Sequence, residues 1–396
     1  MRPKLIFGVI VCVLLLPFSA CRMVDNVQAD RASALLDSLM VYYPSNQPFL
    51  YYEYYPYDKN LKATYLAGQD TISEDKVAYL WPTSGIFSGV NALLRVTDDK
   101  KYEEMLEKVI VPGLDRYYDD TRLPAAYQSY IASAGHSDRF YDDNVWLGLD
   151  FLESYHLTGK DDYLNRSKEI WTFLMSGCDD QLGGGMYWCE QKKESKNTCS
   201  NAPASVLGLK LFQATGDSLY FYKAKGLYEW TKKNLQDGND YVFFDNIKLN
   251  GRVDKAKFAY NTGQMLQAAA LLYKLTKDEN YLNEAQNIAK GGINYFTESY
   301  TTEDGTDMRF FKNRGVWFLA VMFRGYVELY SINKDYQYIQ VFEENLNLAW
   351  EKGRYANGLI NADWSGRQKE KNQWLLNQGA MVELYATLAA VKNGLM

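Results

Sequence analysis

Two adjacent carboxylic acids, Asp142 and Asp143, stand among aromatic residues in segment 139–146, just before an apolar run. One interpretation is helix capping, because an Asp oxygen accepts a hydrogen bond from a free amide of the first helical turn. The other is acid–base chemistry. Neighbouring carboxyls repel each other when both are ionised, so one keeps its proton to a higher pH. An acid beside an ionised carboxylate is the pair that hydrolysis of a glycosidic bond requires.

The spacing of the pair favours one stereochemical course. Retaining glycosidases hold their two carboxyls about 5–5.5 Å apart, whereas inverting enzymes need about 6.5–9.5 Å to admit a water molecule. Neighbouring residues outside a regular helix favour the shorter gap, and retention is the resulting hypothesis. Other mechanisms have less support, because the chain has only two histidines, His136 and His156. No nucleophile–histidine set, phosphate-binding glycine loop or His-rich metal site can be drawn.

A repeated turn indicates the elements that position the pair. The segment Thr97 to Tyr102 returns at 158–163, 215–220 and 276–281, and more weakly at 332–336, with its tyrosines 61, 57, 61 and 55 residues apart. Each turn follows an apolar helical stretch and precedes a more charged, amphipathic one. A helix that is apolar all round is buried, and a one-sided one lies outside it.

Five such hairpins, with helices expected at 31–43 and 373–392, predict twelve helices that alternate between an inner and an outer ring. The predicted fold is all-α, a closed (α/α)6 toroid. The alternative is an open helical solenoid, whose common repeats of about 34 to 47 residues are shorter than these. We expect one domain over residues 31–396.

Loop lengths locate the functional end of the predicted ring. The inner-to-outer connections are short, whereas the outer-to-inner connections are long, at about 44–82, 119–141, 179–200, 237–259, 298–313 and 353–372. In an alternating ring all the long connections and all the inner-helix N-termini fall at one end. Those N-termini carry partial positive charge, which favours ionised carboxylates. The Asp pair therefore lies where a site on loops is expected.

Composition is compatible with a carbohydrate ligand and argues against nucleic acid. The 396 residues include 33 Tyr and 9 Trp, whose rings can stack on sugar faces or fill a core. The net charge is −6 and no basic tract is present, so the charge pattern of a nucleic-acid-binding protein is missing.

The N-terminus has the pattern of a targeting segment. Basic residues precede an apolar run and then small residues before Cys21. Residues 1–20 are predicted to be a lipoprotein signal peptide cleaved before Cys21, with lipid on that cysteine and residues 21–30 as a tether. The alternative is a plain signal peptide. We expect a bacterial cell-envelope protein, lipid-anchored in the outer membrane at its surface or periplasmic face. Cys189 and Cys199 are candidates for a local disulfide.

Three blocks resemble glycoside hydrolase family 76, the endo-α-1,6-mannanases. Segment 141–149, which holds the Asp pair, is similar to the catalytic segment of that family. Segment 183–188, Gly-Gly-Gly-Met-Tyr-Trp, followed by 196–197 and 200–201, resembles a second block, and 258–263 with 271–273 resembles a third. The resemblance runs from about Trp81 to the C-terminus, and an insertion at 189–194 departs from the family pattern.

The resemblance implies an (α/α)6 fold and hydrolysis of α-1,6-mannosidic bonds with retention. It implies Asp142 as nucleophile and Asp143 as acid/base, α-1,6-linked mannan or mannooligosaccharide as substrate, and no cofactor. We expect a monomer. Weaker candidates for contact with sugar rings or hydroxyls, each with core packing or helix capping as its alternative, are Trp81, Asn144, Trp146, Tyr187, Trp188, Asn197, Asn201, Asp245, Tyr260 and Asn261.

Two other hypotheses remain open at this point. One is a different sugar enzyme on the same toroid, such as an unsaturated-uronide hydrolase or an epimerase. Epimerases of this shape rely on histidines at the pore, and His136 is the single candidate there. The other is a non-catalytic glycan-binding lipoprotein, which would keep the aromatic residues and tolerate loss of either Asp.

Overall fold

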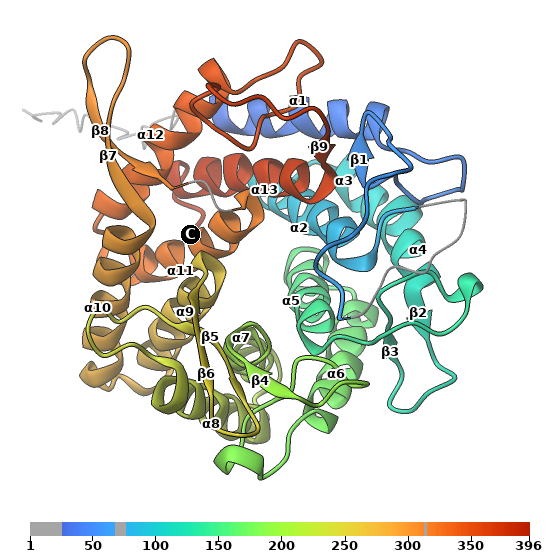
Figure 1. Cartoon of the computed structure of the whole chain (residues 1–396), viewed down its shortest axis with the longest axis vertical. Helices are drawn as coiled ribbons and strands as arrows, with labels where there is room; N and C mark the ends of the chain where they lie inside the picture. Colours follow the sequence, from blue (N-terminus) through green and yellow to red (C-terminus); the bar gives the residue numbers. More distant parts are fainter. Residues whose placement is uncertain (1–25, 68–76, 313–314) are drawn as a thin grey trace, which may run out of the picture.

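The fold is a closed ring of helices, which confirms the predicted (α/α)6 toroid (Figure 1). The structure is a computed structural model that describes residues 26–67, 77–312 and 315–396. Within these residues, each inner helix packs on the next and the last packs on the first. The inner helices are α2 (Leu80–Thr97), α5 (Tyr141–Thr158), α7 (Thr198–Thr215), α9 (Ala259–Thr276), α11 (Val316–Asn333) and α13 (Leu375–Lys392).

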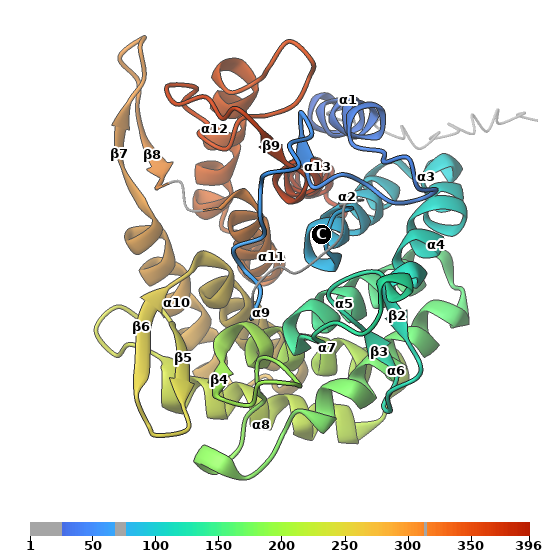
Figure 2. The same ribbon diagram turned by 45° about the vertical axis from the view of Figure 1, so that its right-hand side comes forward.

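The outer helices surround this ring, each beside an inner one (Figure 2). They are α1 (Val27–Tyr42), α6 (Asp161–Ser176), α8 (Ser218–Leu235), α10 (Glu279–Phe296), α12 (Gln337–Lys352) and a segmented helix. The segmented one runs through α3 (Lys100–Met105), a π-helical turn (Leu106–Ile110) and α4 (Val111–Leu114). It is the only outer member within the described chain that changes helix type along its length.

The repeated turns end the inner helices in one conformation. After α2, α5, α7, α9 and α11 a residue adopts the left-handed region, with φ between 52° and 73°. In the α7–α8 turn this residue is Gly216, and the hydroxyl of Thr215 donates to the carbonyl of Leu211 at 2.8 Å. Asp217 then caps α8 by accepting from the amide of Leu219 at 2.9 Å. The repeat is thus a helix stop followed by a helix N-cap.

Burial separates the two rings as the sequence pattern predicts. Along α13, every residue from Leu375 to Val391 is buried. Outer helix α10 buries a single stripe that includes Ala285, Ile288, Ala289 and Phe296, at the spacing of one helical face. Two inner contacts need glycine: a Cβ on Gly263 would lie 2.3 Å from Met322 Cα, and one on Gly379 would lie 2.5 Å from the carbonyl carbon of Gly85.

The long connections gather at the end where the inner helices begin, as expected. They carry short antiparallel strands: β1 (Tyr54–Tyr55) pairs with β9 (Gln373–Trp374), and β2 (Tyr118–Asp119) with β3 (Ala126–Tyr127). A three-stranded sheet has the order β4 (Ser195–Asn197), β5 (Phe244–Lys248) and β6 (Val253–Lys257). The hairpin of β7 (Thr297–Thr301) and β8 (Asp307–Phe311) stands at the ring edge (Figure 1).

The N-terminal predictions are only partly covered. The predicted signal peptide and Cys21 lie outside the described residues, and both stay predictions. Helix α1 begins at Val27, four residues before the expected start at Arg31, so residues 27–30 of the predicted tether are helical. No helix of the described chain combines the length and the apolar character that crossing a membrane needs.

Candidate active site

A cleft of about 450 Å³ opens among the long loops, at the end where the inner helices begin. Its aromatic lining residues are Tyr65, Tyr79, Trp81, Phe140, Trp146, Trp188, Phe258, Tyr260, Trp317 and Phe318. Its charged lining residues are Asp142, Asp143, Glu194, Asp245, Asp254, Lys192 and Lys248. Five carboxyls against two ammonium groups make the cleft acidic.

The first turns of the inner helices supply cleft-lining side chains from the same positions in successive helices. The second residue of five inner helices lines it: Trp81, Asp142, Cys199, Tyr260 and Trp317. The third residue does so in α5 and α11, where it is Asp143 and Phe318. Because all six N-termini point to one end of the ring, side chains far apart in sequence converge there.

Asp142 is held as a hydrogen-bond acceptor in the first turn of α5. Its Oδ2 accepts from the indole Nε1 of Trp188 at 3.0 Å, and its Oδ1 accepts from the amide of Asp143 at 3.1 Å. Burial raises the pKa of Asp142, and hydrogen bonds from the Cys199 thiol and the Trp188 indole lower it in part, leaving it at about 6. Phe140 occupies the N-cap position, so Asp142 accepts from the first-turn amide of Asp143 from within the helix, as its second residue.

Asp143 differs from Asp142 because no N–H or thiol group donates a hydrogen bond to its carboxyl within the described residues. Within the described residues, no hydrogen bond or ion pair to the Asp143 carboxyl is present. Burial, and secondly the charge of Asp142, raise the pKa of Asp143 well above its usual value. The two carboxyls are therefore unequal: burial and the charge of Asp142 make Asp143 the member of the pair that keeps its proton to higher pH.

Asp245 enters the cleft from a bulge in the sheet. The register of β5 against β6 shifts between Phe244 and Asn246, and a bulge of this kind can re-aim a side chain. The Asp245 carboxylate accepts from the Asn246 side chain at 2.7 Å, and burial raises its pKa. Asn197, opposite Asn246 in the ladder, also lines the cleft, where its Oδ1 accepts from Ser195 Oγ at 2.7 Å.

Aromatic rings form one continuous wall of the cleft. Trp81 meets Tyr65 edge-on at 5.0 Å and Trp317 at 5.4 Å between ring centroids. Trp317 also meets Trp146 edge-on at 5.0 Å, and Tyr260 lies 4.3 Å from Phe318. Edge-to-face contacts of this kind stabilise the packing of the rings against one another. The predicted residues Trp81, Trp146, Trp188, Asn197, Asp245 and Tyr260 thus all lie in the cleft.

Two predicted hydroxyl-binding residues serve the scaffold instead. Asn144 and Asn201 are each the fourth residue of an inner helix and are fully buried. The Asn144 amide bonds both the N–H and the carbonyl of Tyr127, at 2.9 and 2.8 Å. Asn201 does the same to Met186, at 2.7 and 2.9 Å. Gln378, the fourth residue of α13, holds Ile360 in this way. The fourth position therefore anchors the preceding loop.

Tyr187 and the glycine loop beside it also lie outside the cleft lining. The Tyr187 hydroxyl donates to Asp179, and the buried Lys196 ammonium donates to that carboxylate and to loop carbonyls including that of Gly184. A Cβ on Gly185 would lie 2.6 Å from the Trp230 ring. The loop is thus folded on Trp230. Of the two aromatic residues that follow it, Trp188 lines the cleft, whereas Tyr187, a predicted sugar contact, does not.

Asn261 and His136 do not line the cleft, and the cysteines do not form the candidate disulfide. Asn261 is fully buried beside Asp245 and does not line the cleft. Cys178, Cys189 and Cys199 are all free thiols, so the candidate disulfide between Cys189 and Cys199 is absent. His136 lies outside the cleft, next to Thr121, and no histidine of the described chain lines it.

Several cleft residues were not predicted from the sequence. Tyr65 and Tyr79 come from the loop before α2, Trp317 and Phe318 from the first turn of α11, and Cys199 from α7. The inner-helix periodicity contained a signal for three of them, because the second residue of five inner helices, and the third residue of two of these, faces the cleft. Across the described ranges, no group of three His, Cys, Asp or Glu residues has the arrangement of a metal site.

The toroid and its acidic, aromatic-walled cleft place the protein among carbohydrate-active (α/α)6 proteins. The sequence profile of Glycosyl hydrolase family 76 matches residues 28–314. The chain belongs to this family, which confirms the resemblance found in the three sequence blocks.

Solved structures and curated relatives agree with this assignment. The chain is similar to glycoside hydrolase family 76 (mannosidase) Bt3792 from Bacteroides thetaiotaomicron, with 33% identity and a TM-score of 0.85, over 93% of this chain and 100% of that one. It shares its fold with an inactive variant of the α-1,6-mannanase GH76A of a Salegentibacter species, in complex with α-1,6-mannotriose, at 21% identity and a TM-score of 0.73, over 92% and 99% of the two chains.

Among curated proteins, the mannan endo-1,6-alpha-mannosidase DCW1 of Saccharomyces cerevisiae is 28% identical over 36% of this chain and 35% of its own length. A Schizosaccharomyces pombe protein described as meiotically up-regulated is 26% identical over 55% of this chain and 51% of its own. The chain therefore spans about half or less of the length of these two relatives.

Proposed function

We propose that this protein is an endo-acting glycoside hydrolase that cleaves α-1,6-mannosidic bonds of mannan with retention. One observation carries the proposal: the cleft holds two adjacent carboxyls that form no ion pair with any described residue and that have unequal pKa values. The family membership and the named α-1,6-mannanase and mannosidase relatives support the bond type. The inactive relative carries two adjacent aspartates replaced by asparagine, which parallels the pair here.

The inequality of the pair assigns the two roles. Asp142 is the nucleophile: it is ionised near neutral pH, and the Trp188 N–H and the positive end of α5 stabilise its charge. Asp143 is the acid/base, because its raised pKa keeps a proton available at the same pH.

The reaction follows in two balanced steps. An Asp142 oxygen bonds to the anomeric carbon while the bond to the leaving oxygen breaks and that oxygen takes the proton of Asp143. A water molecule then gives its proton to the ionised Asp143 and its oxygen to the anomeric carbon, which releases Asp142. Two inversions at one carbon restore the original anomer.

The cleft walls fit a neutral polysaccharide better than the alternatives. Rings such as Trp81, Trp188 and Tyr260 offer apolar surface to sugar faces, and Asp245 and Asn197 offer hydrogen-bond partners for hydroxyls. A uronide substrate would bring a further negative charge into a cleft that already has five carboxyls and two lysines. An epimerase would lack the histidines it needs among the described lining residues.

Incubation with unbranched α-1,6-mannan tests the proposal. We expect new reducing ends together with a rapid fall in chain length, because cleavage of internal bonds shortens the polymer early. Sizing of the products by chromatography checks this. An α-1,2-linked mannooligosaccharide is the control and should stay intact. If mannan binds but no reducing ends appear, the protein is a glycan-binding member of the family and the proposal is wrong.

A further inference from the structure

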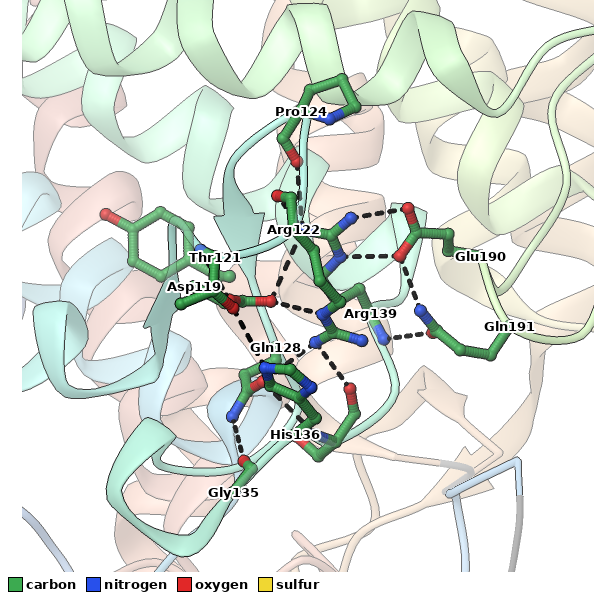
Figure 3. Close-up of polar contacts among 12 residues, drawn as sticks. Asp119, Thr121, Arg122, Pro124, Gln128, Gly135, His136, Arg139, Glu190 and Gln191 are labelled. Atoms are coloured by element: carbon green, nitrogen blue, oxygen red, sulfur yellow. Dashed lines mark hydrogen bonds and ion pairs between the residues drawn. The ribbon is translucent and has the colours of Figure 1, made fainter.

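A buried arginine stands three residues before the nucleophile. Arg139 has 1% of its side chain exposed. Its Nε and Nη2 donate to the two carboxylate oxygens of Glu190 at 2.7 and 2.6 Å (Figure 3). Its Nη1 donates to the carbonyls of Arg122 and Pro124 at 2.9 and 3.0 Å. A bidentate pair of this kind fixes orientation as well as distance.

The surrounding charges are balanced and hold their ionised forms. Arg122 Nε donates to Asp119 at 2.5 Å, and Asp119 lies 3.6 Å from Arg139 Nη1. Burial alone raises the pKa of Asp119, but hydrogen bonds from Thr121 and Arg122 outweigh it and lower the pKa to about 2. Burial also raises the pKa of Glu190, and the bond from Arg139 more than reverses this. The cluster therefore stays ionised across the pH range of an enzyme assay.

The arginine and the nucleophile belong to one short antiparallel ladder. The amide of Glu190 donates to the carbonyl of Arg139 at 3.0 Å, and the amide of Tyr141 donates to the carbonyl of Trp188 at 2.9 Å. The indole of Trp188 then bonds Asp142. The Arg139–Glu190 ion pair clamps one end of the ladder, and the nucleophile with its hydrogen-bond donor lies at the other end.

We propose that Arg139 and Glu190 are positioning residues for the reaction, which set the indole N–H of Trp188 against the Asp142 carboxylate. This inference rests on the proposed function and deepens it. Glu190, the acidic half of the clamp, lies in the segment 189–194 that follows Trp188. Loss of the Glu190 charge leaves Arg139 with a poorer partner, so the segment that carries Trp188 shifts. The N–H that stabilises the ionised nucleophile then moves away from it.

Several other groups act on Asp142, and the test must separate the clamp from them. Asp143 faces it from the same helix, Cys199 from α7, Tyr260 from α9 and Cys189 from the clamp segment itself. Among these, the thiol of Cys199 donates a hydrogen bond and the charge of Asp143 repels. Cys189 is the chain neighbour of Glu190, and its thiol donates to Gln191. Within the described residues, Asp143, Cys199 and Tyr260 form no hydrogen bond or ion pair with Arg139 or Glu190.

The experiment compares Glu190→Gln with the wild-type enzyme on α-1,6-mannooligosaccharides. Because glutamine has the same shape without the charge, we expect kcat to fall roughly tenfold, with KM nearly unchanged. The acid limb of the pH–rate profile should move to higher pH, since a weakened N–H bond raises the pKa of Asp142. Trp188→Phe should move the acid limb to higher pH by about one unit. The double variant, Glu190→Gln with Trp188→Phe, should move it no further than Trp188→Phe alone.

A matched control removes the same kind of pair elsewhere. Arg324 and Glu383 also form a bidentate pair, at 2.6 and 2.9 Å, near the other end of the ring. Glu383→Gln should leave kcat and the acid limb as in the wild type. If Glu190→Gln fails to fold by circular dichroism, Arg139→Lys, which keeps the charge but loses the two-pronged geometry, replaces it with the same expected direction.

Carbon-13 NMR titration of labelled aspartate carboxyls separates the two proposals. A raised Asp142 pKa in Glu190→Gln, but not in Glu383→Gln, supports the clamp even if mannan is not cleaved. An unchanged pKa and an unchanged acid limb in Glu190→Gln overturn the clamp while leaving the hydrolase proposal intact. An equal shift in both variants also overturns it, because the effect would then be general.

Discussion

The two ends of the toroid both hold carboxylates, but among the described residues it is the far-end carboxylates that are mostly joined to cations in ion pairs. At the far end, a cavity of about 360 Å³ is lined by later turns of the inner helices, with four cations and four carboxyls. Arg324 pairs with Glu383, Lys274 with Glu328 and Arg95 with Glu153. At the cleft end, neither Asp142 nor Asp143 forms an ion pair with a described residue, although Lys192 and Lys248 line the same cleft.

The pKa values follow this difference. Burial raises the pKa of Glu153, but the charges of Arg95 and Lys210 outweigh it and lower the pKa. The same balance lowers the pKa of Glu328. In the cleft nothing opposes burial at Asp143, and its pKa rises. Paired carboxylates hold helices together, whereas unpaired ones can exchange protons with a substrate, and so the comparison separates structural from chemical roles.

The strongest test of the comparison substitutes one carboxyl at each end and measures both activity and stability. We expect the cleft substitution to change activity alone and the far-end substitution to change stability alone. Asp143→Asn should reduce hydrolysis of α-1,6-mannan by roughly 10³-fold, because the proton donor is lost. Its free energy of unfolding at pH 8 should not fall, since the change removes a carboxyl that is costly to ionise. Activity assays and urea denaturation measure the two quantities.

The matched change at the far end should do the reverse. Glu383→Gln removes the carboxylate that holds the buried Arg324 guanidinium in a bidentate pair, and we expect it to lower the free energy of unfolding by about 3 kcal/mol. The kcat should stay within about twofold of the wild type, because the pair lies outside the cleft. A large loss of activity in a folded Glu383→Gln protein would show that the two ends are not separate.

A smaller effect is expected on the pH dependence of stability, from Asp150, the far-end lining carboxyl whose pKa is raised. Burial raises the pKa of Asp150 from 3.8 to about 7, although Arg324 partly opposes it. Between these values the folded state binds a proton that the unfolded state has lost. Stability from this group is therefore full below pH 4 and is lost as pH rises through about 7, at roughly 1 kcal/mol per pH unit.

Asp150→Asn should remove this slope. Denaturation at pH 5 and pH 7 should show the wild type losing stability relative to the variant. If the free energy of unfolding changes equally with pH in the two proteins, Arg324 keeps Asp150 ionised. Every carboxyl described at the far end would then be ionised beside a cation.

The architecture was predictable because its signals repeat. Each inner helix stops at a left-handed residue, and in several repeats Thr and Asp flank that stop, as in Thr215, Gly216 and Asp217. Five copies of such a signal fix the ring and the end at which its long loops lie. The Asp pair could be placed for the same reason, since it begins an inner helix.

The details of the cleft were less predictable. An Asn near a helix start looks the same whether it bonds a sugar or, like Asn144 and Asn201, a loop backbone. The distinction depends on helix phase. In α5 and α7 the second residue faces the cleft and the fourth bonds the loop, and the starts of the inner helices expected from the sequence were off by one to three residues. Tyr65 comes from a loop with no repeat signal, and tertiary packing alone brings it to Trp81.

The most direct measurement is the anomer released first from unbranched α-1,6-mannan, followed by proton NMR before mutarotation. Attack by Asp142 with Asp143 as acid and base predicts the α-anomer first. If the β-anomer appears first, water has displaced the leaving group directly, and the assignment of Asp142 as nucleophile is contradicted.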